Sequence, residues 1–178
     1  MSKVGVTKEI SIRSAGPDDA RLISTIASVT FYESYFEQDA PPDLANYIVD
    51  SFAPEKIAAE LADSASHFFI AYRRGKAVGY AKMRDGEPHS SVNSPNPIEL
   101  QRIYLVERTW GTGAGEILLN HCLEFARGIG KDAVWLGVWE ENPRGIAFYT
   151  KHGFRRVGTL QFPYADTVGI NAVMQLKI

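Results

Sequence analysis

The segment RIYLVERTWGTGAGEILLNHCLEFAR, residues 102–127, constrains the fold more than any other part of the chain. An apolar, β-branched run is followed by glycines at alternate positions, Gly111, Gly113 and Gly115, and then by a strongly helical sequence. Glycines in a turn let backbone N–H groups approach a ligand, and a helix N-terminus adds unpaired donors and a partial positive charge. The segment therefore predicts a strand–turn–helix unit that binds a phosphate group.

Two common phosphate motifs do not fit this turn. A dinucleotide-binding G-x-G-x-x-G pattern would need its third glycine at Glu116 or Leu118, depending on the frame. A P-loop needs Gly-Lys followed by Ser or Thr, which the turn lacks. Two interpretations stay open: a tight turn without a ligand, and a site for a different phosphate-bearing cofactor.

The composition limits the class of protein. At 178 residues, 45% apolar and 22% charged, the chain is expected to form one domain over residues 1–178. A net charge of −2 favours neither nucleic acid nor an anionic membrane as a partner. Cys122 is the only cysteine, so no internal disulfide is expected. The N-terminal sequence lacks the apolar core of a signal peptide and no segment is long enough to span a membrane, so we expect a cytoplasmic protein.

Hydrophobic periodicity and breaker residues predict a mixed α/β sheet flanked by helices. The strands are expected over residues 9–14, 67–74, 76–84, 98–106, 133–139, 154–161 and 169–177. The helices are expected over about 16–36, 43–52, 54–63, from the glycine turn to 128, and 143–152. The polar segment 86–97 contains three prolines and is expected to be the most mobile loop.

The helix over 143–152 carries the clearest boundary signals. Asn142 is a good N-cap and Pro143 suits the first helical position. Gly153 is a natural residue to follow the C-terminus.

Two motifs resemble the GCN5-related N-acetyltransferases. The glycine turn is similar to their motif A, Gln/Arg-x-x-Gly-x-Gly, in one of two alignments, starting at Arg108 or at Trp110. The second alignment is preferred because it places EILL where the helix of the family begins, although Trp110 then replaces the usual Gln or Arg. The later segment WLGVWEENPRGIAFYTKHGF resembles motif B of the same family. The chain is most similar to the PaiA-type spermidine/spermine N-acetyltransferases, so the fold of this family is expected.

The resemblance implies that acetyl-CoA is the cosubstrate. The backbone of Ile103, Tyr104 and Leu105 would pair with the pantetheine arm, and one of its N–H groups would polarise the thioester carbonyl. Asn142 either contacts the pantetheine amide or serves only as the N-cap of its helix. The expected cofactor-binding residues are Ile103, Tyr104, Leu105, Trp110, Gly111, Thr112, Gly113, Ala114, Gly115, Asn142 and Tyr149.

Acetyl transfer to an amine needs a base and an acid, because a free alkyl amine has a pKa of about 10 and a thiol one of about 8.5. Glu99 matches the position of the glutamate base in the family, and its alternative is a carboxylate in water or paired with an arginine. Tyr149 matches the general-acid tyrosine of Phe-Tyr-x-Lys-x-Gly-Phe, and its alternative is a packed core tyrosine.

Two carboxylates are candidates for binding the acceptor. Glu33 and Glu37 lie four residues apart in a predicted helix, and such a like-charge pair favours a cation beside it. No metal site is expected, because the spacing of the histidines and the cysteine does not match known ligand sets; these residues are His67, His89, His121, His152 and Cys122.

These observations predict an acetyl-CoA-dependent N-acetyltransferase that acts by direct transfer in a ternary complex. The expected acceptor is a small primary amine, a polyamine such as spermidine or spermine. A protein acetyltransferase for N-terminal or lysine amines, and a non-catalytic CoA-binding regulatory module, remain as alternatives. The sequence leaves a homodimer open.

Overall fold

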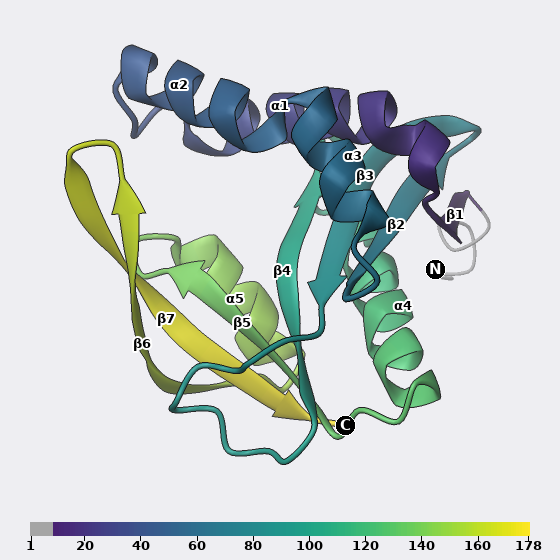
Figure 1. The fold of residues 1–178 in the computed structure, drawn as a ribbon, viewed down its shortest axis with the longest axis vertical. Coiled ribbons are helices and arrows are strands. Elements are labelled where there is room, and N and C mark those ends of the chain that lie inside the picture. Colours follow the sequence, from purple (N-terminus) through teal and green to yellow (C-terminus); the bar gives the residue numbers. More distant parts are fainter. Residues whose placement is uncertain (1–8) are drawn as a thin grey trace. The chain divides into compact units, whose positions relative to one another are not determined.

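A computed structural model describes residues 9–178 (Figure 1). The chain divides into two compact units, and β4 and α4 each contribute to both. The first unit runs to Met83 and resumes over Arg102–Cys122; the second comprises Arg84–Gln101 and Leu123–Ile178. The strands are β1 (Ile10–Ser14), β2 (Ser66–Arg73), β3 (Lys76–Arg84), β4 (Pro97–Leu105), β5 (Ala133–Trp139), β6 (Arg155–Tyr164) and β7 (Thr167–Lys177). The helices are η2 (Pro17–Asp19), α1 (Ala20–Tyr35), α2 (Pro41–Phe52), α3 (Pro54–Ala62), η3 (Glu107–Thr109), α4 (Ala114–Gly128) and α5 (Pro143–Lys151).

The strands form a mixed seven-stranded sheet in the order β1-β2-β3-β4-β5-β7-β6. This arrangement confirms the predicted α/β class. Most predicted boundaries agree to within two or three residues. The main differences are that Pro17–Asp19 form the short η2, so that α1 begins only at Ala20, and that β6 continues to Tyr164.

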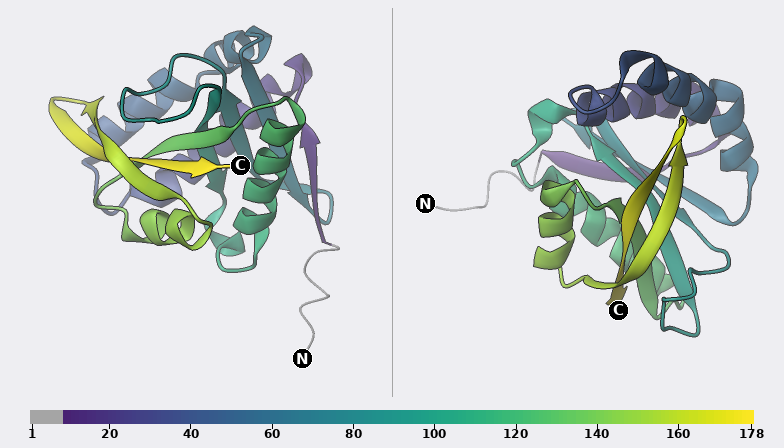
Figure 2. Two further views of the ribbon diagram at one scale, coloured as in Figure 1. Left: turned by 90° about the horizontal axis from the view of Figure 1, so that it is seen from below. Right: turned by 90° about the vertical axis from the view of Figure 1, so that its left-hand side faces the viewer.

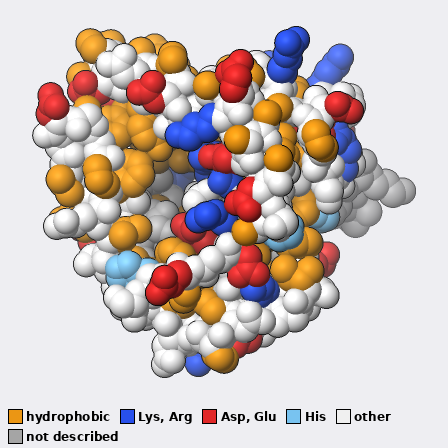
Figure 3. All heavy atoms as spheres, viewed as in Figure 1, with side chains coloured by type: hydrophobic (Ala, Val, Ile, Leu, Met, Phe, Trp, Pro, Cys, Tyr) orange, Lys and Arg blue, Asp and Glu red, His pale blue; other side chains and the backbone are white. Residues whose placement is uncertain are grey.

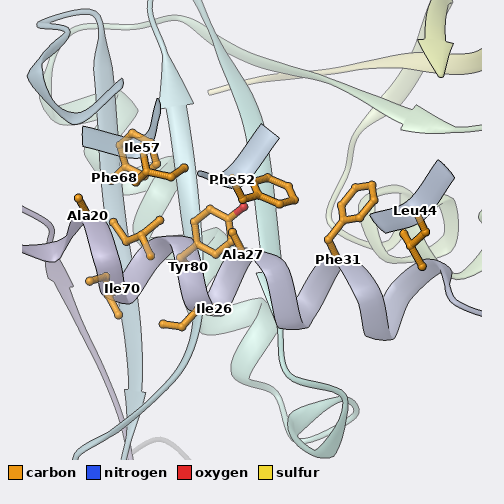
Figure 4. Close-up of a cluster of buried hydrophobic side chains, with 11 residues drawn as sticks. Ala20, Ile26, Ala27, Phe31, Leu44, Phe52, Ile57, Phe68, Ile70 and Tyr80 are labelled. Carbon is orange, nitrogen blue, oxygen red and sulfur yellow. The ribbon is translucent and has the colours of Figure 1, made fainter. Parts of the chain in front are cut away.

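The core of the first unit lies between α1 and the strands β2 and β3. Apolar residues recur along α1 at helical spacing, including Ile23, Ala27 and Phe31, so that one face of the helix is buried. Figure 4 shows Ala27 of α1 together with Phe68 of β2 and Tyr80 of β3, which belong to the same buried cluster. The packing fixes α1 beside the strand pair β3–β4, which carries the glycine turn at its end.

A single glycine controls how closely β3 approaches β4. A Cβ atom added at Gly79 would lie 2.8 Å from Leu105 Cγ and closer still to the carbonyl oxygen of Tyr104. Because one of these atoms belongs to the backbone, a side chain at position 79 would have to push β4 away. Because Gly79 has no side chain, Tyr104 and Leu105 at the end of β4 can lie directly against β3.

We expect Gly79→Ala to destabilise the protein by about 1–3 kcal/mol, the usual cost of overpacking a buried site. The free energy of unfolding in urea measures this effect. Gly86→Ala is the matched control, because the nearest atom to its added Cβ is 3.9 Å away and belongs to the flexible Arg84 side chain. Equal stability of the two variants would contradict the role of Gly79.

The second unit is built around the strand order β4-β5-β7-β6. β4 and β5 are parallel and pair only from Pro97–Ala133 to Glu99–Trp135. β5 then continues to Trp139 in antiparallel pairing with β7, and β6 and β7 form a long hairpin (Figure 2). The parallel pairing thus ends early, while β5 continues for four more residues.

The loop before β4 is held to the second unit by side-chain hydrogen bonds. The backbone N–H of Asn93 donates to Gln175 Oε1 at 3.0 Å, and Gln175 Nε2 donates to the Asn93 carbonyl at 3.0 Å. Ser94 donates to the Asp132 carboxylate. The segment is irregular, as predicted. Contrary to the predicted mobility, these hydrogen bonds hold it against other residues of the second unit.

Candidate active site

The chain turns sharply where β4 ends in the first unit. The N–H of Val106 donates to the Val78 carbonyl at 2.9 Å, and the N–H of Trp110 donates to the Glu107 carbonyl at 2.8 Å. Gly111 and Gly113 follow with φ of +72° and +88°. Only glycine adopts these left-handed conformations without strain, so the two predicted glycines are required by the backbone.

The space beside these glycines is open. A Cβ atom added at Gly111 or Gly113 would meet no heavy atom of the described chain within 4 Å. A glycine that served only close packing of the protein would have neighbours at that distance. The positive φ angles and the open space together leave room for a ligand against the backbone of the turn.

Helix α4 begins immediately after the turn. Its first i→i−4 hydrogen bond joins the Ile117 N–H to the Gly113 carbonyl at 3.1 Å, so the N–H groups of residues 113–116 precede the regular ladder. They lie at the positive end of the helix dipole. The helix starts at Ala114, two residues before EILL, so Gly115 lies in its first turn. Together with the open glycines, this helix end can hold an anion such as a pyrophosphate.

The side chain of Trp110 connects the turn to the end of β4 by a hydrogen bond. Its indole Nε1–H donates to the Leu105 carbonyl at 2.9 Å. The adjacent Thr112 hydroxyl donates to the Thr109 carbonyl at 2.7 Å. Both side chains therefore stabilise the turn from within, and backbone N–H groups at the start of α4 are the candidate donors for a ligand. Trp110, which stands where the family usually has Gln or Arg, therefore has a structural role in this turn.

Glu99 lies where the parallel pairing of the second unit ends. It is the last residue of β4 that pairs with β5, opposite Trp135, and its side chain is half-buried. A carboxylate at the end of a strand pair can reach a bound molecule while the strand fixes its backbone. The position fits a general base, and the assignment stays a prediction.

Asn142 and Tyr149, the other two predicted site residues of the second unit, lie at the start of helix α5 and within it. The Oδ1 atom of Asn142 accepts from the N–H of Gly145 at 2.8 Å, which confirms the predicted N-cap. Gly153 follows the helix with φ of +89°, as predicted. The half-buried ring of Tyr149 lies 5.3 Å from the ring of Phe148 and 5.6 Å from that of Phe154. These contacts fix the ring, and the contact of Asn142 with pantetheine stays a prediction.

The predicted pair of acceptor-binding carboxylates is divided by the end of α1. Glu33 lies within the helix, and its Oε2 atom accepts from the backbone N–H of Glu107 at 2.8 Å. Glu37 is exposed in the turn that follows Tyr35, so the two residues do not share a helical face. In Figure 3, carboxylates and hydrophobic side chains lie together over α2 and the end of α1. The sequence could not show that Glu33 also supports the segment leading into the glycine turn.

The sequence analysis missed a buried ionic cluster in the first unit. Arg102 Nη1 and Nη2 donate to the two oxygens of Glu60 at 2.7 and 3.0 Å, and Lys82 Nζ lies 3.1 Å from the same carboxylate. Burial raises the pKa of Glu60, but the bonds and charges of Arg102 and Lys82 hold it below its ordinary value. A lysine within the apolar strand β3 was the available signal. The cluster ties α3 to β3 and β4.

Other reactive groups do not form a site. Burial raises the pKa of the Cys122 thiol to about 12, so it is not a nucleophile at neutral pH. Within residues 9–178 no group of three or more His, Cys, Asp or Glu side chains is placed to hold a metal ion. No helix in the same range is long and apolar enough to cross a membrane.

The fold and the turn define a class of acyl-transferring proteins, and comparison with known sequences gives the family. The profile of the acetyltransferase (GNAT) family matches residues 25–154. An uncharacterised N-acetyltransferase of Mycobacterium tuberculosis is 31% identical over 81% of this chain and 88% of its own length. The chain therefore belongs to the GNAT family of N-acetyltransferases, as the two motifs predicted.

Solved structures support the fold. The PaiA N-acetyltransferase of Thermoplasma acidophilum, solved in complex with coenzyme A, superposes with a TM-score of 0.77 at 21% identity and covers 95% of this chain and 99% of its own. The spermidine/spermine N-acetyltransferase SpeG of Vibrio cholerae, solved in two mutant forms, gives a TM-score of 0.68 at 18% identity over 96% and 94%. These identities establish the shared fold alone.

Proposed function

We propose that this protein transfers an acetyl group from acetyl-CoA to a primary amine, and that the acceptor is a polyamine such as spermidine or spermine. The observation that carries the proposal is the turn at residues 110–115, where two positive-φ glycines face open space before the N-terminus of α4. This arrangement fits the pyrophosphate of coenzyme A. The PaiA structure in complex with coenzyme A has the same fold, which supports the choice of cofactor.

The remaining residues complete the binding of the cofactor. Acetyl-CoA supplies the activated acetyl group. The backbone of Ile103, Tyr104 and Leu105 is proposed to bind its pantetheine arm as an added strand. Asn142 is proposed to contact the same arm, and an N–H of the strand to polarise the thioester carbonyl. Such a contact contributes about 3 kcal/mol to stabilising a transition state.

Two side chains are proposed to move protons. Glu99 accepts the proton of the acceptor amine, because only the neutral amine attacks the carbonyl carbon. Tyr149 donates its phenolic proton to the sulfur as the carbon–sulfur bond breaks. The products are the N-acetyl amine and the free thiol of coenzyme A, so one proton is taken and one is given in each turnover.

The polyamine assignment rests on similarity and on charge. The motifs of the sequence resemble PaiA-type enzymes, and the SpeG structure shares the fold. Glu33 and Glu37 are proposed to attract the cationic acceptor, with Asp39 and Asp43 nearby in the chain. Carboxylates attract an acceptor that carries several positive charges.

Release of free thiol from acetyl-CoA, measured across a panel of polyamines, amino acids, aminoglycosides and peptides, tests the function. We expect release that saturates with spermidine and depends on the amine. Saturation by peptides alone would favour a protein acetyltransferase. Binding of coenzyme A without amine-dependent release would favour a regulatory module.

We expect Gly113→Ala to raise the dissociation constant of coenzyme A by about tenfold, because a residue with a Cβ at φ of +88° costs about 1–2 kcal/mol and the turn would change shape. Isothermal titration calorimetry measures the constant directly. Gly128→Ala at the other end of α4 is the control, since its added Cβ meets no described atom within 4 Å. Unchanged binding in Gly113→Ala would remove the turn from the cofactor site.

A further inference from the structure

A carboxylate on α1 caps the short helix that leads into the glycine turn. The helix η3 (Glu107–Thr109) follows Val106, whose apolar side chain makes no capping hydrogen bond. The first N–H groups of a helix have no partner within it and need an acceptor from elsewhere. Here Glu33 Oε2 accepts from the Glu107 N–H at 2.8 Å, across 74 residues of the chain. Glu33 therefore supplies from another helix the cap that Val106 cannot supply.

The same peptide unit continues the connection into the turn. The carbonyl of Glu107 accepts from the N–H of Trp110 at 2.8 Å, and Gly111 follows with φ of +72°. One residue of η3 and two hydrogen bonds therefore connect Glu33 to the start of the turn. A shift of Glu107 would move Trp110 and with it the backbone that leads to the glycines.

The segment before the turn is held on two sides. The N–H of Val106 donates to the carbonyl of Val78 on β3 at 2.9 Å, and Glu33 holds the next residue to α1. On α1 the neighbouring residues Thr30 and Phe31 are buried, so this part of the helix is fixed in the core. A segment with one anchor can rotate about it, whereas a second anchor fixes its direction. Together the two bonds determine how η3 leaves the sheet.

Charge alone does not explain a carboxylate in this position. The turn is proposed to bind a pyrophosphate, and a negative charge close to an anion site weakens binding by repulsion. A benefit of Glu33 to the cofactor site must therefore come from geometry. Holding a loop in its bound conformation lowers the cost of ordering it when the ligand binds. Charge and positioning thus predict opposite effects on cofactor affinity when the side chain is removed.

We infer that Glu33 is a positioning residue of the cofactor site, whose carboxylate holds η3 so that the glycine turn has its binding conformation before coenzyme A arrives. This role needs an acceptor oxygen and not a negative charge, so it is separate from the proposed attraction of the acceptor amine. The inference rests on the proposed function. It adds a residue outside the turn that determines the affinity for coenzyme A.

Calorimetric titration with coenzyme A, in the absence of any amine, tests the inference with Glu33→Ala and Glu33→Gln. Alanine removes the acceptor oxygen and keeps α1 helical, so we expect the dissociation constant to rise by about fivefold. Glutamine keeps an oxygen that accepts from the Glu107 N–H, so the constant should stay within about twofold of the wild type. Glu55→Ala, exposed on α3, makes the same change in net charge and should match the wild type.

The outcomes that overturn the inference are distinct. If Glu33→Ala binds coenzyme A as tightly as the wild type or more tightly, Glu33 does not position the turn. A loss of stability in urea without a change in affinity would show a structural role alone. An equal loss of affinity in Glu33→Gln would show that the acceptor oxygen is not what matters. A wild type that does not bind coenzyme A would instead contradict the proposed function.

Glu107→Pro removes the donor of the same hydrogen bond. Proline suits the first position of a helix, and the ψ of +139° at Val106 allows a proline to follow. We expect the dissociation constant to rise by about fivefold, as in Glu33→Ala. In the Glu33→Ala background the same change should alter it by less than about twofold, because the bond is already absent. A full further loss in the double variant would show that the two groups act independently and would overturn the inference.

Discussion

Replacing Tyr149 by phenylalanine is expected to lower kcat for amine acetylation by about 100-fold, because general acids contribute about 10²–10⁴ to the rate. The substitution removes only the hydroxyl that is proposed to protonate the departing thiolate. The ring contacts with Phe148 and Phe154 do not depend on that hydroxyl, so the fold should be kept. The dissociation constant of acetyl-CoA should change by less than twofold.

Three measurements make this result specific. Stopped-flow release of the thiol gives the rate of the chemical step, calorimetry gives the affinity for coenzyme A, and thermal unfolding gives Tm. Tyr32→Phe removes a phenol from the exposed face of α1 and should change none of them. A normal kcat in Tyr149→Phe would exclude Tyr149 as the acid.

Replacing Glu99 by glutamine is expected to lower kcat at pH 7 by about 100-fold and to change its dependence on pH. Without the base, only acceptor molecules that are already neutral react, and an alkyl amine has a pKa of about 10. The kcat of the variant should therefore rise by about tenfold per pH unit until the amine pKa is reached. The wild type should reach its plateau at lower pH.

The pH–rate profile distinguishes a base from a structural carboxylate. If the carboxylate only supports the strand, its loss would lower kcat by the same factor at every pH and would leave the shape of the profile unchanged. Glu87→Gln, in the exposed part of the loop before β4, is the control and should match the wild type throughout. An unchanged profile in Glu99→Gln would remove Glu99 from proton transfer.

Local sequence signals predicted the elements whose ends are set by local chemistry. Helix α5 begins and ends as expected, because Asn142 accepts the hydrogen bond of Gly145 and Gly153 adopts the left-handed conformation. Strand β5 matches the continuous apolar run 133–139. The glycine turn was likewise visible, because positive φ angles demand glycine whatever the rest of the chain does.

Contacts between distant segments could not be predicted in the same way. Glu33 accepts from Glu107, 74 residues further along the chain, and Glu60 pairs with Arg102 across 42 residues. The bonds between Asn93 and Gln175 likewise fix a loop whose composition predicts mobility. Each depends on which elements pack together, which no short window of sequence contains.

The sequence by itself determined the family, the order of the elements and the turn that is proposed to bind the cofactor, because glycine, proline and capping residues act within a few positions of themselves. The tertiary structure decided where the β4–β5 pairing ends, and therefore that Glu99 is its last paired residue on β4. It also brought the rings of Tyr35, Tyr47 and Tyr104, from α1, α2 and β4, together around Phe31. This packing depends on which elements lie side by side, which is a property of the folded chain and not of any one segment.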